Sequence, residues 1–162
     1  MDLEALEAIK RLKYKYMRCL DQKRWQEIRE CFSQDATAAY SGGKYTYEGR
    51  EAIVGFLEKS MGAESFLSCH RVSHPEIDFA GDDTATGIWA LEDTVIETQW
   101  GITIRGAAFY EDRYVKLPDG WKIQHTGYRR TYEEIQPRGN VDGLKLTAHW
   151  WNTDGQSDLD LD

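Results

Sequence analysis

The first third of the chain has the hydrophobic periodicity of helices. Apolar residues return every three or four positions over residues 3–20, which predicts a helix with one apolar face. That face contains Ile9, Leu12, Tyr16 and Cys19. Two more helices are predicted, a short one over residues 24–32 and a longer one over Arg50–Met61, which ends at Gly62.

From residue 66 onward the period changes from about 3.6 residues to about 2, as in strands. The alternating stretches are residues 66–79, 84–98, 102–117 and 121–133. Residues 36–47 add a hairpin around Ser41-Gly42-Gly43. Helices followed by a long antiparallel series of strands predict an α+β domain. Glycines inside the strands predict a sheet that bends around a cavity, and they are Gly87, Gly106 and Gly127.

The rest of the chain has weaker periodicity and ends in the acidic sequence DGQSDLDLD. We therefore predict one domain over residues 1–136 and a C-terminal extension over residues 137–162 whose end frays. A length of 162 residues with 41% hydrophobic and 30% charged residues suits one domain with one core. No run approaches the ~18 apolar residues of a membrane span, and no signal-peptide pattern opens the chain, so a cytoplasmic protein with no membrane partner is expected.

The charge balance makes nucleic acid an unsuitable partner, because the net charge is -8 and the pI is about 5.0. The basic residues of the stretch 10–18 (KRLKYKYMR) are predicted to face solvent on the first helix. The three cysteines, Cys19, Cys31 and Cys69, include no C-x-x-C pair. They argue against a disulfide framework and for a reducing compartment.

Strand alternation identifies polar residues that point inward. Asp93 shares the apolar face of its strand with Trp89 and Leu91, where a carboxylate is costly unless it is paired or functional. His70 is either a core histidine with satisfied hydrogen bonds or a general acid or base. As a base it needs an acceptor on its second ring nitrogen, and Asp21, just past the first helix, could supply that carboxylate. The predicted face of His70 also holds Phe66, Ser68, Val72 and His74.

Two tyrosines and one arginine complete the candidate set. Tyr16 lies on the apolar face of the first helix and Tyr40 enters the hairpin. Each either packs in the core or donates its hydroxyl to a substrate carbonyl or leaving hydroxyl. Arg130 is either exposed or pairs with Asp93 or an anionic substrate group. Its predicted strand face also holds Thr126, Tyr128 and Tyr132.

Other chemistries have less support. A metal site could be drawn from His70 and His74 with Asp93 or His125, but their spacing is not that of zinc ligands, and no metal is predicted. The Ser41-Gly42-Gly43-Lys44 stretch lacks the form of a phosphate loop. No elbow motif supports a serine or cysteine nucleophile.

Six stretches, in this order, resemble a known family: AIKRLKYKYMRCLD, AYSGGK, HRVSHPEIDF, DTATGIWALED, GAAFYEDRYVK and GWKIQHTGYRRTYEE. They resemble the bile-acid 7α-dehydratase group, in the scytalone-dehydratase-like and SnoaL-like branch of the NTF2-like superfamily, over residues 8–134. The resemblance implies a cone-shaped α+β barrel in which three helices cover a curved, mostly antiparallel sheet. It also implies a homotrimer.

The resemblance implies catalytic roles for five residues, namely Tyr16, Asp21, Tyr40, His70 and Asp93. Arg130, Trp89 and Tyr128 are the candidate substrate-binding residues. The implied reaction removes water from a 7α-hydroxylated 3-oxo-Δ4 steroid, without metal or redox cofactor. The resemblance does not choose between a free bile acid, its coenzyme A thioester and another polycyclic ketone as the substrate. The segments expected to shape the substrate end of the pocket match the family less well, namely residues 49–67 and 97–103 and the tail beyond Ile135. The alternatives are a steroid or polyketide isomerase or cyclase of the same fold, and a binding module without activity.

Overall fold

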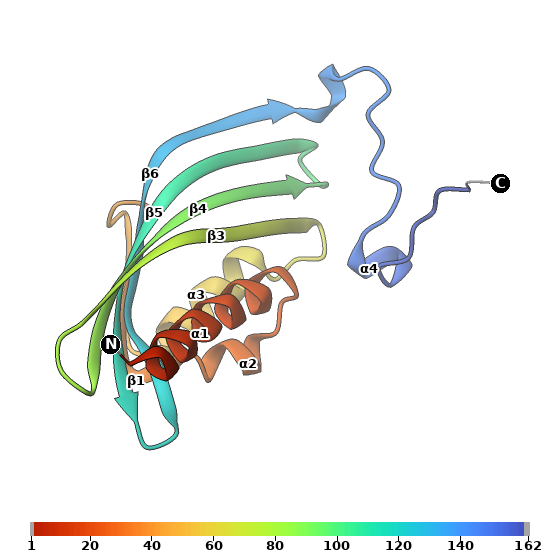
Figure 1. Ribbon diagram of the computed structural model, residues 1–162. Helices are drawn as coiled ribbons and strands as arrows, with labels where there is room; N and C mark the ends of the chain where they lie inside the picture. Colours follow the sequence, from red (N-terminus) through yellow and green to blue (C-terminus); the bar gives the residue numbers. More distant parts are fainter. Residues whose placement is uncertain (1, 161–162) are drawn as a thin grey trace.

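The computed structural model describes residues 2–160. Helices α1 (Leu3–Asp21), α2 (Trp25–Arg29) and α3 (Arg50–Met61) lie against one face of a six-stranded sheet (Figure 1). The strands are β1 (Phe32–Tyr40), β2 (Tyr45–Glu48), β3 (Phe66–Phe79), β4 (Thr84–Glu97), β5 (Ile102–Leu117) and β6 (Gly120–Pro137). The short 3-10 helix η1 (Arg138–Asn140) and helix α4 (Trp150–Thr153) follow. The predicted α+β fold, with helices on a curved and mostly antiparallel sheet, is confirmed.

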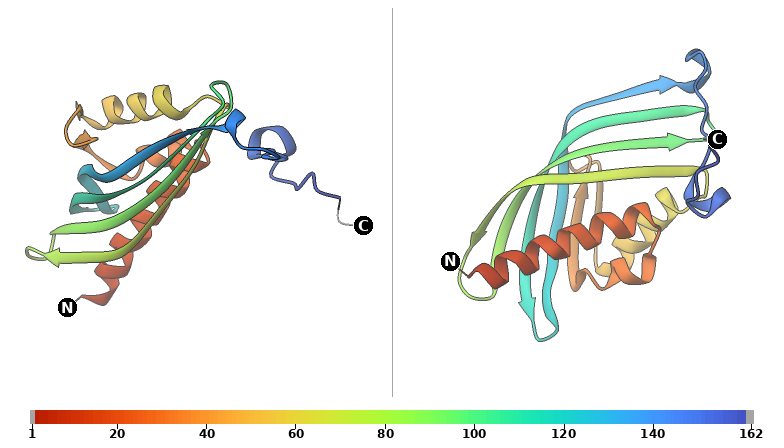
Figure 2. Two further views of the ribbon diagram at one scale, coloured as in Figure 1. Left: turned by 90° about the horizontal axis from the view of Figure 1, so that it is seen from above. Right: turned by 45° about the vertical axis from the view of Figure 1, so that its right-hand side comes forward.

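The strand order is β2-β1-β6-β5-β4-β3. Strand β6 pairs in parallel with β1, and all other neighbours are antiparallel. Strands β3 to β6 bend together, so the concave face of the sheet curves around α1 and α3, as both views in Figure 2 show. This concave face and the two helices form the walls of the interior.

The apolar face predicted for the first helix is buried, with one addition. Asp2 caps the helix by accepting a hydrogen bond from the Ala5 amide at 3.0 Å, and Ile9 and Tyr16 are completely buried. Lys13 is also completely buried, because Asp112 of β5 supplies a buried carboxylate partner. The prediction that the basic residues of the stretch 10–18 face solvent is therefore wrong at Lys13.

The predicted end of the second helix is wrong. The second helix ends at Arg29 rather than at residue 32, because Phe32 begins β1 and pairs with Ile123 of β6. The hairpin turn is confirmed, and the positive φ angles of Ser41, Gly42 and Gly43 allow its tight reversal.

Irregular pairing moves two residues off their predicted faces. In β3 the register shifts between Ser73 and Glu76, so His74, with a φ of 50°, is exposed and does not share the inner face with His70. In β6 an extra residue at position 131 turns Tyr132 outward, while Thr126 and Tyr128 keep the predicted face of Arg130. Bulges of this kind leave no mark in the hydrophobic alternation.

The C-terminal segment contacts the body of the domain at Lys23. The Lys23 ammonium donates to the backbone oxygens of Met61 and Phe66 at 2.7 Å each, and it lies 4.3 Å from the ring centre of Trp151. The last two residues of the tail predicted to fray lie outside the described residues. Over residues 2–160, no helix is long and apolar enough to cross a membrane.

Candidate active site

A histidine and an aspartate from different elements form a close pair. Asp21 is the last residue of α1, and His70 lies on the inner face of the edge strand β3. His70 Nδ1 is 2.6 Å from Asp21 Oδ1. Since a carboxylate accepts, Nδ1 carries the proton and Nε2 is left as the basic nitrogen. The predicted His70–Asp21 contact is confirmed.

Two further hydrogen bonds fix the Asp21 carboxylate. The backbone amide of His70 donates to Oδ2 at 2.9 Å, and the Ser68 hydroxyl donates to Oδ1 at 2.9 Å. With three donors, Asp21 has one orientation relative to the imidazole ring. Sequence reasoning did not identify Ser68 as part of this group, although it placed Ser68 on the same strand face as His70.

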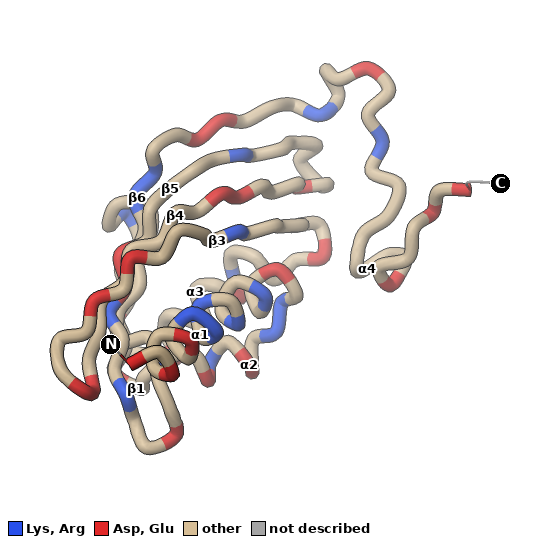
Figure 3. Tube along the Cα trace, viewed as in Figure 1, with Lys and Arg blue, Asp and Glu red and all other residues tan. Residues whose placement is uncertain are grey.

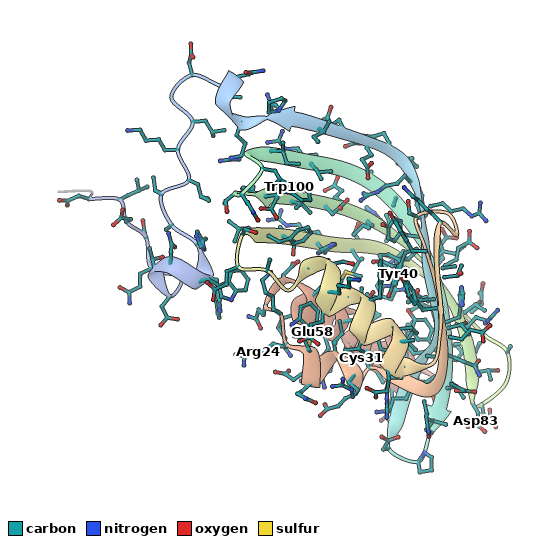
Figure 4. The ribbon with its side chains drawn as sticks, turned by 180° about the vertical axis from the view of Figure 1, so that it is seen from behind. Arg24, Cys31, Tyr40, Glu58, Asp83 and Trp100 are labelled. Atoms are coloured by element: carbon teal, nitrogen blue, oxygen red, sulfur yellow. The ribbon has the colours of Figure 1, made fainter. Side chains whose placement is uncertain are left out.

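Two buried tyrosines face each other across the interior. The Tyr16 hydroxyl of α1 and the Tyr40 hydroxyl at the end of β1 are 3.0 Å apart. Figure 4 shows Tyr40 in the region where α3 faces the curved sheet. Burial raises the pKa of both phenols, so they keep their protons and act as hydrogen-bond donors.

Asp93 and Arg130 form an ion pair beside the histidine. Asp93 of β4 lies directly opposite His70 of β3 in the sheet register. Both Arg130 guanidinium Nη atoms donate to the Asp93 carboxylate, with an Nη2–Oδ2 distance of 2.9 Å. This is the pairing that the sequence left as one alternative for Arg130. The guanidinium also lies 5.2 Å from the ring centre of Tyr128.

A glycine makes room for this ion pair. Gly106 of β5 lies opposite Asp93, and a Cβ atom there would come within 2.6 Å of Arg130 Nη1 and 2.8 Å of the Tyr132 carbonyl oxygen. Any side chain at this position would displace the guanidinium from Asp93. The glycine predicted to bend the sheet therefore permits a close approach of a side chain and the backbone.

These groups line one cavity of about 160 Å³ between the helices and the sheet. Seven of the eight candidate residues come together: Tyr16, Tyr40, His70, Asp93, Tyr128 and Arg130 line the cavity, and Asp21 supports His70. The other lining residues are Leu20, Tyr45, Phe56, Leu57, Ser60, Met61, Leu91 and Tyr110.

Trp89 is not part of the cavity lining. It is completely buried, and its indole nitrogen donates to the Tyr114 hydroxyl at 2.9 Å. Trp89 lies four residues before Asp93 on the same strand face, which places it deeper in the core. The structure therefore places this candidate substrate-binding residue in the core, away from the lining that the other candidates form.

A buried polar network adjoins the cavity. Lys13 Nζ is 2.7 Å from Asp112 Oδ2, and both side chains are completely buried. The Tyr114 and Thr126 hydroxyls each donate to Asp112 at 2.7 Å. Sequence reasoning missed this network and the cavity residue Tyr110, although alternation along β5 puts Tyr110, Asp112 and Tyr114 on one buried face.

The four residues of the metal alternative do not gather. His74 is exposed on the bulge of β3, and His125 hydrogen-bonds through Nδ1 to the Thr37 hydroxyl at 2.7 Å. Within residues 2–160, no group of three or more His, Cys, Asp or Glu side chains is placed to hold a metal ion.

Comparisons with known proteins agree on the fold. A family model described as "SnoaL-like domain" matches residues 1–127. The structure of a candidate scytalone dehydratase from Novosphingobium aromaticivorans has 25% sequence identity and a TM-score of 0.76, covering 82% of this chain and 88% of that one.

Two dehydrochlorinase structures have the same fold at lower identity. Hexachlorocyclohexane dehydrochlorinase LinA type 2 is 18% identical with a TM-score of 0.77, covering 90% of this chain and 95% of that one. LinA type 3 from Novosphingobium barchaimii is 19% identical with a TM-score of 0.75, covering 91% and 97%. These similarities confirm the NTF2-like fold and the scytalone-dehydratase-like structural relationship expected from the sequence.

Proposed function

Because the chain belongs to the SnoaL-like domain family, within the NTF2-like superfamily, we propose that it is a dehydratase that works without a cofactor. The observation that supports this most is the His70–Asp21 pair, which faces the same cavity as the Tyr16–Tyr40 pair. A base and a pair of hydroxyl donors on one small cavity suit the removal of a proton and a hydroxyl from neighbouring carbons.

The substrate we propose is a hydroxylated polycyclic enone, with a 7α-hydroxy-3-oxo-Δ4 steroid as the favoured member. The enone acidifies the γ C–H bond next to the carbon that bears the hydroxyl. His70 Nε2 accepts that proton, and the electrons of the C–H bond pass into a dienolate. When the carbonyl re-forms, the C–O bond breaks and the hydroxyl leaves with the proton as water. The product is a conjugated dienone.

The other polar residues stabilise the charges of this reaction. The imidazolium formed at His70 keeps its hydrogen bond to the Asp21 carboxylate, and Asp93 lies opposite His70 in the sheet. Arg130 holds Asp93 in a bidentate pair, so this carboxylate keeps a fixed place next to His70. The phenols of Tyr16 and Tyr40 donate to the dienolate oxygen or to the departing hydroxyl.

The shape of the interior bears on the size of the substrate. A cavity of about 160 Å³ holds the reacting rings and is smaller than typical pockets of about 300–1,000 Å³ for whole ligands. An apolar strip continues from it along the inner face, through Val95 of β4 and its partners Ile104 and Ile135. At this end β5 and β6 curve away from α1 and α3 (Figure 1). We propose that the remaining rings of a steroid lie along this strip.

The test is incubation of the purified protein with a 7α-hydroxy-3-oxo-Δ4 steroid, as free acid and as coenzyme A thioester, followed by absorbance and mass spectrometry. Dehydration lowers the mass by one water and moves the absorbance to longer wavelength. An isomerised or cyclised product of unchanged mass would replace the proposal with the isomerase or cyclase alternative. Tight binding of the steroid without formation of any product would support the alternative of a binding module without activity.

We also propose a homotrimer, in which the convex face of the sheet contributes to the interface. This face exposes Ile88, Phe109 and Tyr132 at 42%, 48% and 55%. Positive and negative residues alternate over β3 to β6 (Figure 3), and within residues 2–160 six convex-face charges form no ion pair. They are Glu92, Arg105, Glu111, Arg113, Arg129 and Glu134. Exposed apolar side chains among charges of both signs suit a contact between identical chains.

Light scattering should therefore give three times the mass of one chain. Phe109→Glu should shift this mass to that of a monomer, because a buried contact would receive a charge. Leu117→Glu, at the last residue of β5, is the matched control and should remain trimeric, because Leu117 is 37% exposed and lies eight residues along the strand from Phe109. A monomeric wild type, or a trimeric Phe109→Glu variant, would argue against this assembly.

A further inference from the structure

A charge pair next to the cavity has no part in the proton transfers described above. Lys13 and Asp112 are both completely buried, with Nζ and Oδ2 2.7 Å apart. Removing two charges from water costs several kcal/mol per ion, and well-packed apolar residues are often as stable as such a pair. Stability alone therefore gives little reason for a lysine in this position.

The Lys13 ammonium lies against the ring of a cavity residue. Nζ is 3.4 Å from the ring centre of Tyr110 and 5.1 Å from that of Tyr16. Tyr110 lines the cavity, and its ring meets the Tyr16 and Tyr128 rings edge to face, with centres 6.4 and 5.6 Å apart. A cation over an aromatic face draws on its π electrons. For a phenol, this loss of ring electron density makes the O–H group a stronger hydrogen-bond donor.

The partners of Asp112 keep the ammonium in this position. Asp112 does not line the cavity, and its second oxygen accepts from Thr126 while Tyr114 shares the oxygen that faces Lys13. Because the two hydroxyls fix the Asp112 carboxylate, the ion pair holds the Lys13 ammonium against the face of the Tyr110 ring. The pair as a whole is neutral, yet its positive end is the one that contacts the cavity wall.

We propose that Lys13 is a positioning residue that strengthens the Tyr110 phenol as a donor to an anionic oxygen in the cavity. Tyr110 then acts together with the Tyr16–Tyr40 pair, so three phenols face the charge that develops on a ligand. The inference rests on the proposed function, in which that anion is a dienolate or a departing hydroxide. The ligand class it predicts is a planar enolate or phenolate.

The experiment measures the binding of 4-nitrophenol and of nitrobenzene by equilibrium dialysis. Because the phenolate absorbs at longer wavelength than the phenol, the absorbance of bound 4-nitrophenol shows how much of it is ionised. The test variant is Lys13→Met/Asp112→Asn, which removes both buried charges. The matched control is Lys15→Met/Glu30→Gln, which removes one charge of each sign from a surface pair that also begins on α1.

In the test variant we expect affinity for 4-nitrophenolate to fall about tenfold and affinity for nitrobenzene to stay within about twofold, since only the charged ligand uses the stronger donor. The control variant should bind both ligands as the wild type does. Unchanged phenolate affinity in the folded test variant would overturn the proposal. Equal losses for both ligands would also overturn it, because they would mean a role in packing alone.

Tyr110→Phe keeps the ring and the cation contact and removes only the hydroxyl, so it serves even if the double variant does not fold. It should also weaken 4-nitrophenolate binding about tenfold, and unchanged binding would overturn the proposal. Steroid turnover separates this inference from the proposed function. If phenolate binding depends on Lys13 but the protein does not dehydrate the steroid, only the proposed reaction is refuted. Wild-type kcat in the folded double variant would refute only the role of Lys13.

Discussion

Replacing His70 by alanine should lower the turnover number by about 10²–10⁴-fold, the range for loss of a general acid or base. Nε2 is the one imidazole nitrogen left free, because Nδ1 is bound to Asp21 at 2.6 Å. Without the ring, no other group in the cavity combines a free basic nitrogen with a place beside two carboxylates. Steady-state kinetics on the steroid enone, with circular dichroism of each variant, make the measurement.

Three further variants sharpen this result. Asp21→Asn keeps the size of the side chain but removes the negative charge that holds the imidazole ring. We therefore expect a large fall in kcat with a smaller change in KM. His74→Ala, at the exposed bulge of the same strand, is the matched control and should retain wild-type turnover. His125→Ala removes a histidine bound to Thr37 outside the cavity lining and should also be active. Near-normal turnover of a folded His70→Ala variant would contradict the assignment of the base.

Much of this site follows from local sequence patterns. Period-2 alternation puts Asp93 on the buried face of β4, and the end of the helical period puts Asp21 at the end of α1. Both residues therefore reach the interior by rules that act within one element. Their approach to His70 depends on the edge strand β3 lying alongside α1, which periodicity does not specify.

Bulges account for the faces that were predicted wrongly. One extra residue in a strand reverses the face of every residue after it. In β3 the shift next to Pro75 turns His74 outward, and in β6 the extra residue at position 131 turns Tyr132 outward. Both shifts depend on pairing with a neighbouring strand, so a single strand read alone does not reveal them.

Lys13 illustrates a different limit. It lies four residues after Ile9 and three before Tyr16, which puts it on the apolar face of the first helix. Its charge favours the solvent side, and the basic residues around it make a solvated surface the ordinary interpretation. Only the carboxylate of Asp112, far away in the sequence but adjacent in the fold, makes burial possible. Two inward-facing charges of opposite sign on separate elements are the sequence signal for such a pair.

The second large effect concerns this pair and the stability of the fold. We expect Lys13→Met to lower the free energy of unfolding by about 3–5 kcal/mol, because it leaves the buried Asp112 carboxylate without its cation. Adding Asp112→Asn should restore much of the loss, since the buried charge is then gone, the amide oxygen still accepts from one of the two hydroxyls, and the amide NH₂ can donate to the oxygen of the other. The free energies come from urea unfolding curves combined in a double-mutant cycle.

The cycle separates the buried pair from an ordinary surface pair. Lys15→Met on the same helix breaks a partly exposed contact with Glu30 at 2.8 Å, and water replaces the lost partner, so its unfolding curve should stay close to that of the wild type. If Lys13→Met were no more destabilising than Lys15→Met, the Asp112 carboxylate would have another source of stabilisation. A large loss in the single variant with recovery in the double variant would mean that the fold tolerates a neutral pair. The two charges would then be retained for what the ammonium does at the Tyr110 ring, which phenolate binding measures.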